Sequence, residues 1–277
     1  MVSLASRRKV FFHLMGRGFS VRLSSGISGR SRNALRRPPK DRNPELRRQV
    51  LDLAQKFPRY GAMQIWSMLR LTGMHVNKKA VERIWREEGL SLRTRKRKKL
   101  KIDRPVPNKP MAKNETWSMD FVHERLENGR QVRILGVLDA FTRECLLLKA
   151  APCYSSSDVK RDLEWLFLLF GKPDRIRTDN GPEFRALSLL ASSVHHDFIQ
   201  PGSPWQNGHI ESFFGKLRNE LLSCELYTSG AELQASLDEF QDHYNNERPH
   251  SALGGLPPSS FRKRVDLDII QEATITL

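Results

Sequence analysis

Three acidic residues stand at points where a charge is costly to bury. Asp120 interrupts an otherwise apolar stretch, Asp179 ends another and precedes an Asn-Gly-Pro turn, and Glu211 lies near the start of a stretch with helical spacing. Three such acids brought together would repel one another unless divalent cations lay between them. Oxygen-only ligation suits Mg²⁺ or Mn²⁺. Two such ions can activate a water or a 3′-hydroxyl and stabilise the leaving oxygen of an in-line phosphoryl displacement.

Each acid also has an ordinary structural interpretation. Asp120 alone could be a salt-bridged strand residue, Asp179 could cap the following helix, and Glu211 could simply favour a helix N-terminus. The combination favours chemistry, because three acids at the ends of adjacent core elements need a cation. We therefore predict that Asp120, Asp179 and Glu211 are the catalytic residues and the metal ligands, with Mg²⁺ or Mn²⁺ as the cofactor.

The segment that must position these acids begins near residue 116 and has an α/β pattern. Three consecutive strands followed by alternating helices and strands predict a mixed five-stranded sheet with flanking helices. Asp179 then lies at the carboxyl end of a strand, the usual place for a site in α/β folds. The expected strands are 117–122, 132–139, 144–150, 175–179 and 196–200, and the expected helices are 156–170, 182–192, 207–222 and 232–245.

The first 90 residues predict a small all-α region instead. Residues 5–37 have the pattern of a helix-turn-helix, with a frayed basic tail as the alternative. Residues 44–89 form a second helical unit, in which Pro44 takes the first helical position and Asn77 caps the last helix. On that last helix, Lys78 and Lys79 are candidates to contact phosphates, although a solvated surface explains them nearly as well.

Charge is divided unevenly along the chain. The net charge is +16, but residues 1–110 hold 29 lysines and arginines against 7 acids, whereas residues 111–277 hold 18 against 24. This division indicates a DNA-binding front joined to a part with another task, and predicts strongly salt-dependent binding to double-stranded DNA. The expected divisions are a helix-turn-helix-like segment at 1–39, a helical DNA-binding domain at 40–90, a basic and proline-rich linker at 91–110, a catalytic core at 111–265 and a tail at 266–277.

Other compositional features indicate a cytoplasmic protein without a membrane segment. No uninterrupted apolar run approaches the ~20 residues that span a bilayer, and the N-terminus does not have the pattern of a signal peptide. The three cysteines are scattered without metal-binding spacing, and we expect buried, reduced thiols.

Several longer motifs carry a family resemblance. In the core region these are WSMDF at 117–121, DAFTRE at 139–144, RTDNGPEF at 177–184, PGSPWQNG at 201–208, ESF at 211–213 and YNNERPH at 244–250. Upstream they are RYG at 59–61, VNKK at 76–79 and WREEGL at 85–90. Together they resemble the DDE integrase core, as in retroviral integrases, and in particular the OrfB transposase subunit of the insertion-sequence-three family. The resemblance covers about residues 8–265.

The resemblance implies a ribonuclease-H-like core that nicks DNA at an element's ends and transfers a 3′-hydroxyl to a new phosphodiester, with two Mg²⁺ ions per site. Asp120, Asp179 and Glu211 match the family's catalytic triad. Arg218 matches the basic residue seven positions after the glutamate. The YNNERPH motif is expected to cap the last helix and pin the C-terminal segment. The residues expected to contact DNA are Arg218, Lys216, Asn180, Gln206, Asn207, Arg93, Arg95, Lys96, Arg97, Lys98, Lys99, Lys78 and Lys79.

One departure from the family keeps alternatives open. Between Asp179 and Glu211 lie 31 residues, whereas the family usually has roughly a helical turn, about four residues, more. The shortening falls within 186–196. One alternative is therefore a DNA-binding regulator or degenerate copy with an inactive core, and another is a nuclease that cuts without joining. The expected partners are a second copy of the chain, because two ends must meet, and an OrfA product of an upstream frame, separate or fused.

Overall fold

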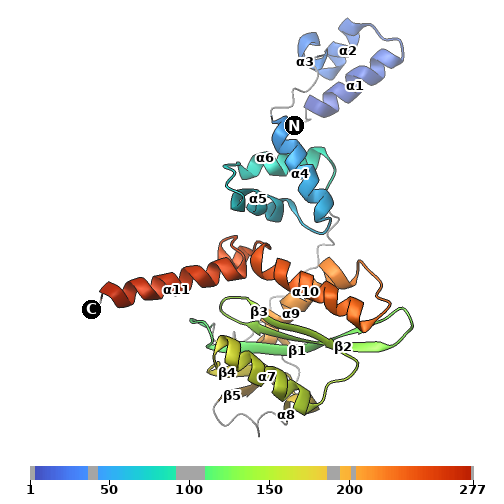
Figure 1. Ribbon diagram of the computed structural model, residues 1–277. Coiled ribbons are helices and arrows are strands. Elements are labelled where there is room, and N and C mark those ends of the chain that lie inside the picture. Colours follow the sequence, from blue (N-terminus) through green and yellow to red (C-terminus); the bar gives the residue numbers. More distant parts are fainter. Residues whose placement is uncertain (1–3, 37–42, 92–109, 186–193, 201–203, 276–277) are drawn as a thin grey trace. The chain divides into compact units, whose positions relative to one another are not determined.

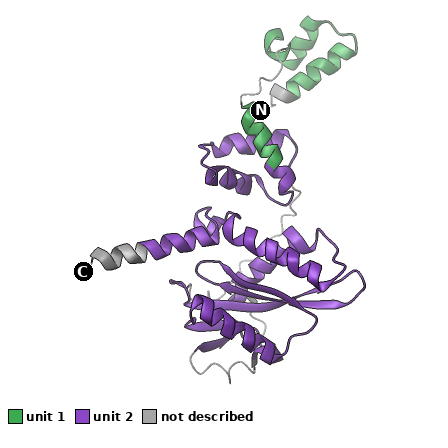
Figure 2. Ribbon diagram, viewed as in Figure 1, with its two compact units in different colours: residues 1–52 green, residues 53–277 purple. Residues whose placement is uncertain are grey.

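The computed structural model describes residues 4–36, 43–91, 110–185, 194–200 and 204–275. The chain divides into two compact units, unit 1 (Met1–Asp52) and unit 2 (Leu53–Leu277) (Figure 2). Helix α4 (Pro44–Lys56) runs across this division and begins at Pro44, as expected. Residues 92–109, most of the predicted basic and proline-rich linker, lie outside the described residues.

Short helices make up the first part of unit 1: α1 (Leu4–Gly16), α2 (Val21–Ser28) and α3 (Arg32–Arg36). The Ser20 hydroxyl accepts a hydrogen bond from the backbone N–H of Leu23 and so caps α2. Gly29, with a φ of 64°, ends α2 in the left-handed conformation that glycine adopts without strain. The expected succession of helix, turn and short basic helix is therefore confirmed.

The described start of unit 2 continues with α5 (Ala62–Leu71) and α6 (Lys78–Glu87), which pack together. Asn77 caps α6, because its side-chain oxygen accepts from the N–H of Lys79 at 2.9 Å. Ile65, Val81 and Ile84 are fully buried. The apolar spacing of this segment therefore produces the packed helices that the sequence predicted.

A five-stranded mixed sheet forms the core of unit 2 (Figure 1). Its order is β3-β2-β1-β4-β5; β1, β2 and β3 are antiparallel neighbours, whereas β4 runs parallel to β1 and β5 runs parallel to β4. The fold class predicted from the strand pattern is confirmed. The strands are β1 (Thr116–Arg125), β2 (Gln131–Asp139), β3 (Cys145–Ala151), β4 (Arg175–Thr178) and β5 (His195–Phe198).

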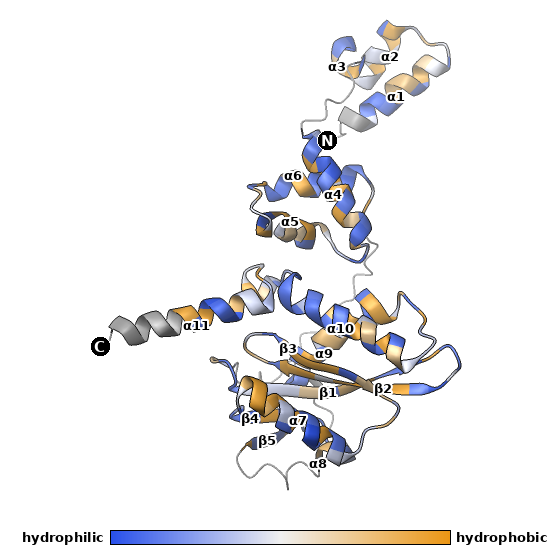
Figure 3. Ribbon diagram, in the orientation of Figure 1, coloured by the Kyte–Doolittle hydropathy of each residue, from blue (hydrophilic) through white to orange (hydrophobic). Residues whose placement is uncertain are grey.

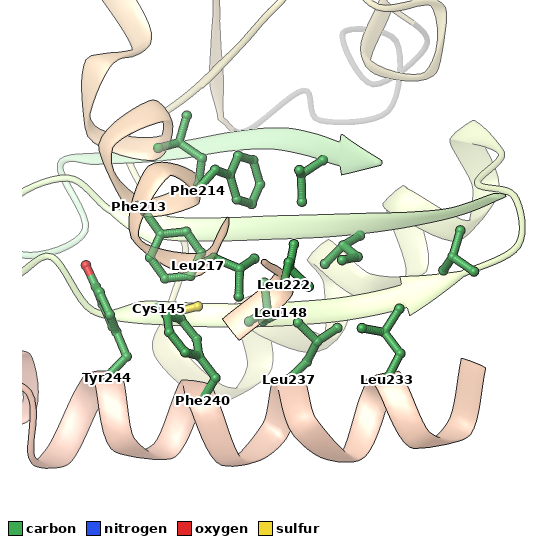
Figure 4. Packing of buried hydrophobic residues seen from close by; sticks show 14 of the residues in the cluster. Cys145, Leu148, Phe213, Phe214, Leu217, Leu222, Leu233, Leu237, Phe240 and Tyr244 are labelled. Atoms are coloured by element: carbon green, nitrogen blue, oxygen red, sulfur yellow. The ribbon is translucent and has the colours of Figure 1, made fainter. Parts of the chain in front are cut away.

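Helices cover both faces of this sheet, and the central strands are mostly hydrophobic (Figure 3). The side chains of α7 (Ser156–Phe170) pack with Trp117 and Met119 of β1 in one cluster. The opposite cluster joins α9 (Gly208–Leu217) and α10 (Gly230–Asn246) to the other face. Figure 4 shows the aromatic and aliphatic side chains of α10 pointing toward the sheet. Shorter helical elements are α8 (Pro182–Arg185), η2 (Pro204–Asn207), η3 (Arg218–Leu222) and η4 (Ser251–Leu253).

Three features of the sequence prediction differ from the described structure or extend beyond it. The helix expected at 182–192 is described only as α8, because 186–193 lie outside the described residues. The boundary expected between 265 and 266 falls inside α11 (Pro258–Ile275), so the predicted tail continues a helix. The expected burial of the cysteines holds for Cys145 but is wrong for Cys153 and Cys224, which are exposed. Among the described helices, none is long and apolar enough to cross a membrane.

Candidate active site

The pairing of β1 with β4 brings two of the predicted acids to one place. The two strands are parallel, and the last pair in register is Ser118 with Arg177. Asp120 and Asp179 each follow two residues later. Since side chains alternate along a strand with a period of two, the Asp120 carboxyl group emerges on the face of Ser118, and Asp179 follows the end of β4 by one residue. Asp179 also turns the chain, because its Oδ1 accepts from the N–H of Gly181 at 2.9 Å.

Helix α9 carries the third acid, and it packs on β1 and β2. Glu211 lies in the first turn of α9 and is exposed. Asn207, just before the helix, is buried, and its side-chain N–H donates to the carbonyl of Met119 at 3.2 Å. Because Met119 immediately precedes Asp120, this hydrogen bond ties the start of α9 to the strand that carries the first acid.

The electrostatics of Asp120 reflect this gathering. Burial first, and then the negative charges of Asp179 and Glu211, raise the pKa of Asp120 to about 6. The backbone N–H of Phe121, which donates to Oδ1 of Asp120 at 2.7 Å, opposes the rise, as does Arg218. The three acids and Arg218 therefore share one electrostatic neighbourhood, in which added positive charge stabilises the ionised form of Asp120.

The donor chemistry of this neighbourhood fits a hard divalent cation, because it offers carboxylate oxygens, one of them on the half-buried Asp120. Over the described ranges, however, no group of three or more His, Cys, Asp or Glu side chains stands at ligand spacing. A closed ligand set therefore requires the carboxyl groups to move closer together. The exposed Glu211 side chain has the freedom to do so.

Two residues expected to contact DNA have their side chains in loop contacts. The Asn180 side-chain N–H donates to the carbonyl of Ile199 at 2.9 Å, and Oε1 of Gln206 accepts from the N–H of Gln200 at 2.9 Å. Both contacts hold described residues between β5 and α9, Ile199 in the first and Gln200 with Gln206 in the second. In the structure, the Asn180 and Gln206 side chains shape the described parts of this loop.

The predicted cations are spread over several elements. Arg218 is exposed at the end of α9, whereas Lys216 is half-buried and its Nζ lies 3.3 Å from Oγ of Ser212. Burial, and then the nearby Arg248, lower the pKa of Lys216 to about 8. Lys78 and Lys79 are exposed on α6. The other cations lie outside the described residues: Arg93, Arg95, Lys96, Arg97, Lys98 and Lys99.

The YNNERPH motif connects α10 to β3 and also to the C-terminal segment, and the second connection was expected. The Asn245 side chain accepts from the N–H of Cys145 at 2.9 Å and donates to its carbonyl at 2.8 Å, so it pins α10 to β3. The hydroxyl of Ser259 on α11 donates to the carbonyl of Asn245 at 2.8 Å. The pinning of the C-terminal segment is therefore confirmed. His250 is buried, and burial lowers its pKa to about 3, so it is neutral near pH 7.

The buried charge of Asp120 makes a prediction about stability. A carboxyl whose pKa is raised in the folded state destabilises the fold above that pKa, and the penalty fades as the pH falls toward the ordinary value of 3.8. Without added metal, Asp120→Asn is therefore expected to stabilise the protein at pH 8 by about 2 kcal/mol, less than the pKa change alone would give, because the carboxyl is partly exposed.

Thermal melts in a chelator at pH 8 and pH 4.5 check this expectation. The gain in melting temperature should be large at pH 8 and much smaller at pH 4.5. Asp174→Asn, the same change at an exposed position, serves as the control. An equal gain from Asp120→Asn at both pH values would show that its ionised form carries no penalty.

Models of known protein families match nearly all of the domains described above. Residues 110–204 and 192–258 match two models of the family described as Integrase core domain, and residues 40–98 match the HTH-like domain. The sheet order and flanking helices are those of an integrase-type, ribonuclease-H-like core.

Individual relatives extend this match over most of the chain. The IS407 insertion-element protein of Burkholderia multivorans, named an uncharacterized 31.7 kDa protein, is 38% identical over 249 residues and covers 87% of this chain and 90% of its own. The IS476 protein of Xanthomonas euvesicatoria is 37% identical and covers 87% of this chain and 72% of its own. Transposase InsD of IS2 from Escherichia coli is 29% identical, covering 76% and 75%.

Among solved structures, the catalytic core of HTLV-2 integrase in complex with magnesium aligns with a TM-score of 0.42 and 20% identity, covering 53% of this chain and 95% of that one. The relatives above 30% identity match most of both lengths, and the family matches fall on the helical and sheet regions in the expected order. The chain belongs to the insertion-element transposases, with an HTH-like domain followed by an integrase core domain.

Proposed function

We propose that this chain is a DDE-type transposase, a polynucleotidyl transferase that binds the ends of its insertion element, cuts a strand and joins the 3′-hydroxyl to a new phosphodiester. The observation that supports the proposal is the nearness of Asp120, on β1, to Asp179, which follows the parallel strand β4, and to Glu211, because both charges raise the pKa of Asp120. Acids are gathered in this way where a cation is to be bound.

Asp120, Asp179 and Glu211 would hold Mg²⁺, or Mn²⁺, at two positions. Bound there, the ions would activate the attacking oxygen and stabilise the leaving one. The remaining tasks fall to the protein. The Asp179 turn and the Asn180 and Gln206 contacts would keep the scissile strand beside the acids. Arg218 would hold a phosphate or neutralise part of the carboxylate charge.

DNA binding would fall to the front of the chain and to the edge of the site. Lys78 and Lys79 on α6, together with the basic residues 93–99, would neutralise phosphates of the element ends. The end-binding segment would then be residues 1–39, and the second DNA-binding domain would be residues 40–90. The linker would be residues 91–110, and the catalytic core would be residues 111–265. A second copy of the chain is one proposed partner, because two element ends must be joined. An OrfA product from an upstream frame is the other, and the proposed place of action is the DNA of the nucleoid.

A DNA-binding regulator with an inactive core is the second candidate. It is favoured by the 31-residue separation of Asp179 and Glu211 and by the lack of a closed ligand set over the described residues. Such a protein would bind the same DNA without altering it.

The deciding experiment incubates the full chain with labelled duplexes from the DNA that flanks its gene, with Mg²⁺ or with a chelator. A transposase should give nicked strands with free 3′-hydroxyls and joined products in Mg²⁺ only, while binding the duplex in both conditions. Nicking without joining would identify a nuclease. Binding without either product in Mg²⁺ or Mn²⁺ would identify the regulator and overturn the proposal.

A further inference from the structure

A glycine lies opposite the first acid in the sheet. Gly136, in the middle of β2, is the register partner of Asp120 in the antiparallel pair of β1 and β2. Its neighbours Leu135 and Val137 are fully buried. Its backbone does not adopt a left-handed conformation, so its φ does not call for glycine. Glycine weakens a strand interior, and its presence there marks a close approach of another group.

That group is the ring of Phe214 on α9. A Cβ built on Gly136 would lie 2.7 Å from both Cε1 and Cζ of Phe214, a separation that real Cβ contacts essentially never show. The same Cβ would lie 3.4 Å from Cδ1 of Ile210, an ordinary contact. The tip of the Phe214 ring therefore occupies the space that any side chain at 136 would need. Figure 4 shows Phe214 beside Phe213 within the packed cluster.

Phe214 is also a neighbour of the third acid. It follows Glu211 by three residues on α9, and residues three apart lie close on a helix surface. The depth to which the Phe214 ring enters the sheet therefore sets the distance of the Glu211 backbone from β1 and β2. A side chain at 136 would push the ring, and with it this turn of α9, away from Asp120.

A second contact holds the start of the same helix. The hydrogen bond from Asn207 to the carbonyl of Met119 attaches α9 to β1 one residue before Asp120. Gly136 accepts the helix on β2, at the register partner of Asp120. One contact of α9 is thus on β1 and the other on β2, both beside Asp120. A side chain at 136 that displaced Phe214 would therefore rotate α9 about the contact at Asn207.

We propose that Gly136 is a positioning residue of the active site, whose missing side chain lets Phe214 seat α9 close against the sheet and so sets how near Glu211 lies to Asp120. The inference rests on the proposed function, because it assigns Glu211 to the same site as Asp120. In this role Gly136 would touch neither metal nor DNA, and it would act only through the placement of α9.

The test measures Mn²⁺ binding by the full chain, from the electron paramagnetic resonance signal of free Mn²⁺, together with the melting temperature. Gly136→Ala is expected to raise the half-saturating Mn²⁺ concentration about tenfold, as is usual when support behind a ligand is lost. Leucine lacks Cε1 and Cζ, so Phe214→Leu removes both colliding atoms. In the Phe214→Leu background, Gly136→Ala should change the Mn²⁺ half-saturation less than about twofold. Gly230→Ala, where a Cβ meets nothing within 4 Å, is the matched control and should leave it unchanged.

Two results would overturn the inference. One is a Gly136→Ala protein that melts earlier but binds Mn²⁺ as the unaltered chain does, which would make Gly136 a packing residue only. The other is an effect of Gly136→Ala that persists undiminished with Phe214→Leu; this comparison also decides the matter if Gly136→Ala alone does not fold. A failure of the proposed function looks different, because Asp179→Ala would then leave Mn²⁺ binding unchanged whatever stands at 136.

Discussion

Asp179→Ala is expected to reduce strand cutting and joining by about a thousandfold or more, with binding to the element ends unchanged. The reason is the position of Asp179, one residue past the end of β4, which runs parallel to the strand β1 that carries Asp120. On the proposed function, removing this carboxylate would remove a metal ligand and part of the charge that attracts the ion. The measurement compares joined products in Mg²⁺ with retention of the same duplex in a gel-shift titration.

Two further variants separate chemistry from local structure. Asp179→Asn keeps a side-chain oxygen that can accept from the N–H of Gly181, so it should retain the turn and still lose the activity. Asp174→Ala makes the same change at an exposed residue just before β4 and should cut and join normally. Joining at the ordinary rate by Asp179→Ala would mean that the acid triad is wrongly assigned.

Arg248→Ala is expected to destabilise the core by about 3–5 kcal/mol, the usual cost of leaving one member of a buried ion pair alone. Arg248 donates two hydrogen bonds to Glu220, of 2.6 and 2.8 Å, and the two side chains are only 6% and 11% exposed. Without Arg248, the Glu220 carboxylate stays buried and loses its partner. Denaturant unfolding of the full chain, followed by tryptophan fluorescence, measures the change.

An exposed pair supplies the control for this prediction. Arg161 and Asp158 on α7 are 2.9 Å apart, with side chains 68% and 33% exposed, so Arg161→Ala should cost about 0.5 kcal/mol or less. Replacing both buried partners, as Arg248→Met with Glu220→Leu, should recover much of the lost stability, because no charge is then left buried. If Arg248→Ala costs no more than Arg161→Ala, the buried pair does not stabilise the core.

Much of the fold follows from short-range patterns. The apolar alternation of β1 and β2 and the spacing of Val159, Leu163 and Leu166 on α7 specify their elements locally, because strand and helix periods differ. Helix α11 was not predicted, since the charged stretch from Arg262 to Arg264 follows its start and no continuous apolar stripe marks it.

The motifs around the acids were also recognisable from the sequence, since they are contiguous. Asp120 and Asp179 stand at strand positions that can be read from the residues beside them. Glu211 was assigned by its local motif, although its distance from Asp179 is shorter than the family's. The structure places it on α9 over the same sheet face, and its part in catalysis stays a prediction.

The sequence by itself determined the order of the strands and of the helices before α11 and the basic front, and it predicted the three acids, because each depends on residues close together in the chain. Only the tertiary structure decided how the acids interact and what holds them. The raised pKa of Asp120, the seat of Phe214 on Gly136 and the hydrogen bond from Asn207 to Met119 each join residues far apart in sequence. Burial and close approach are properties of packed surfaces, and neither exists until the sheet and α9 come together.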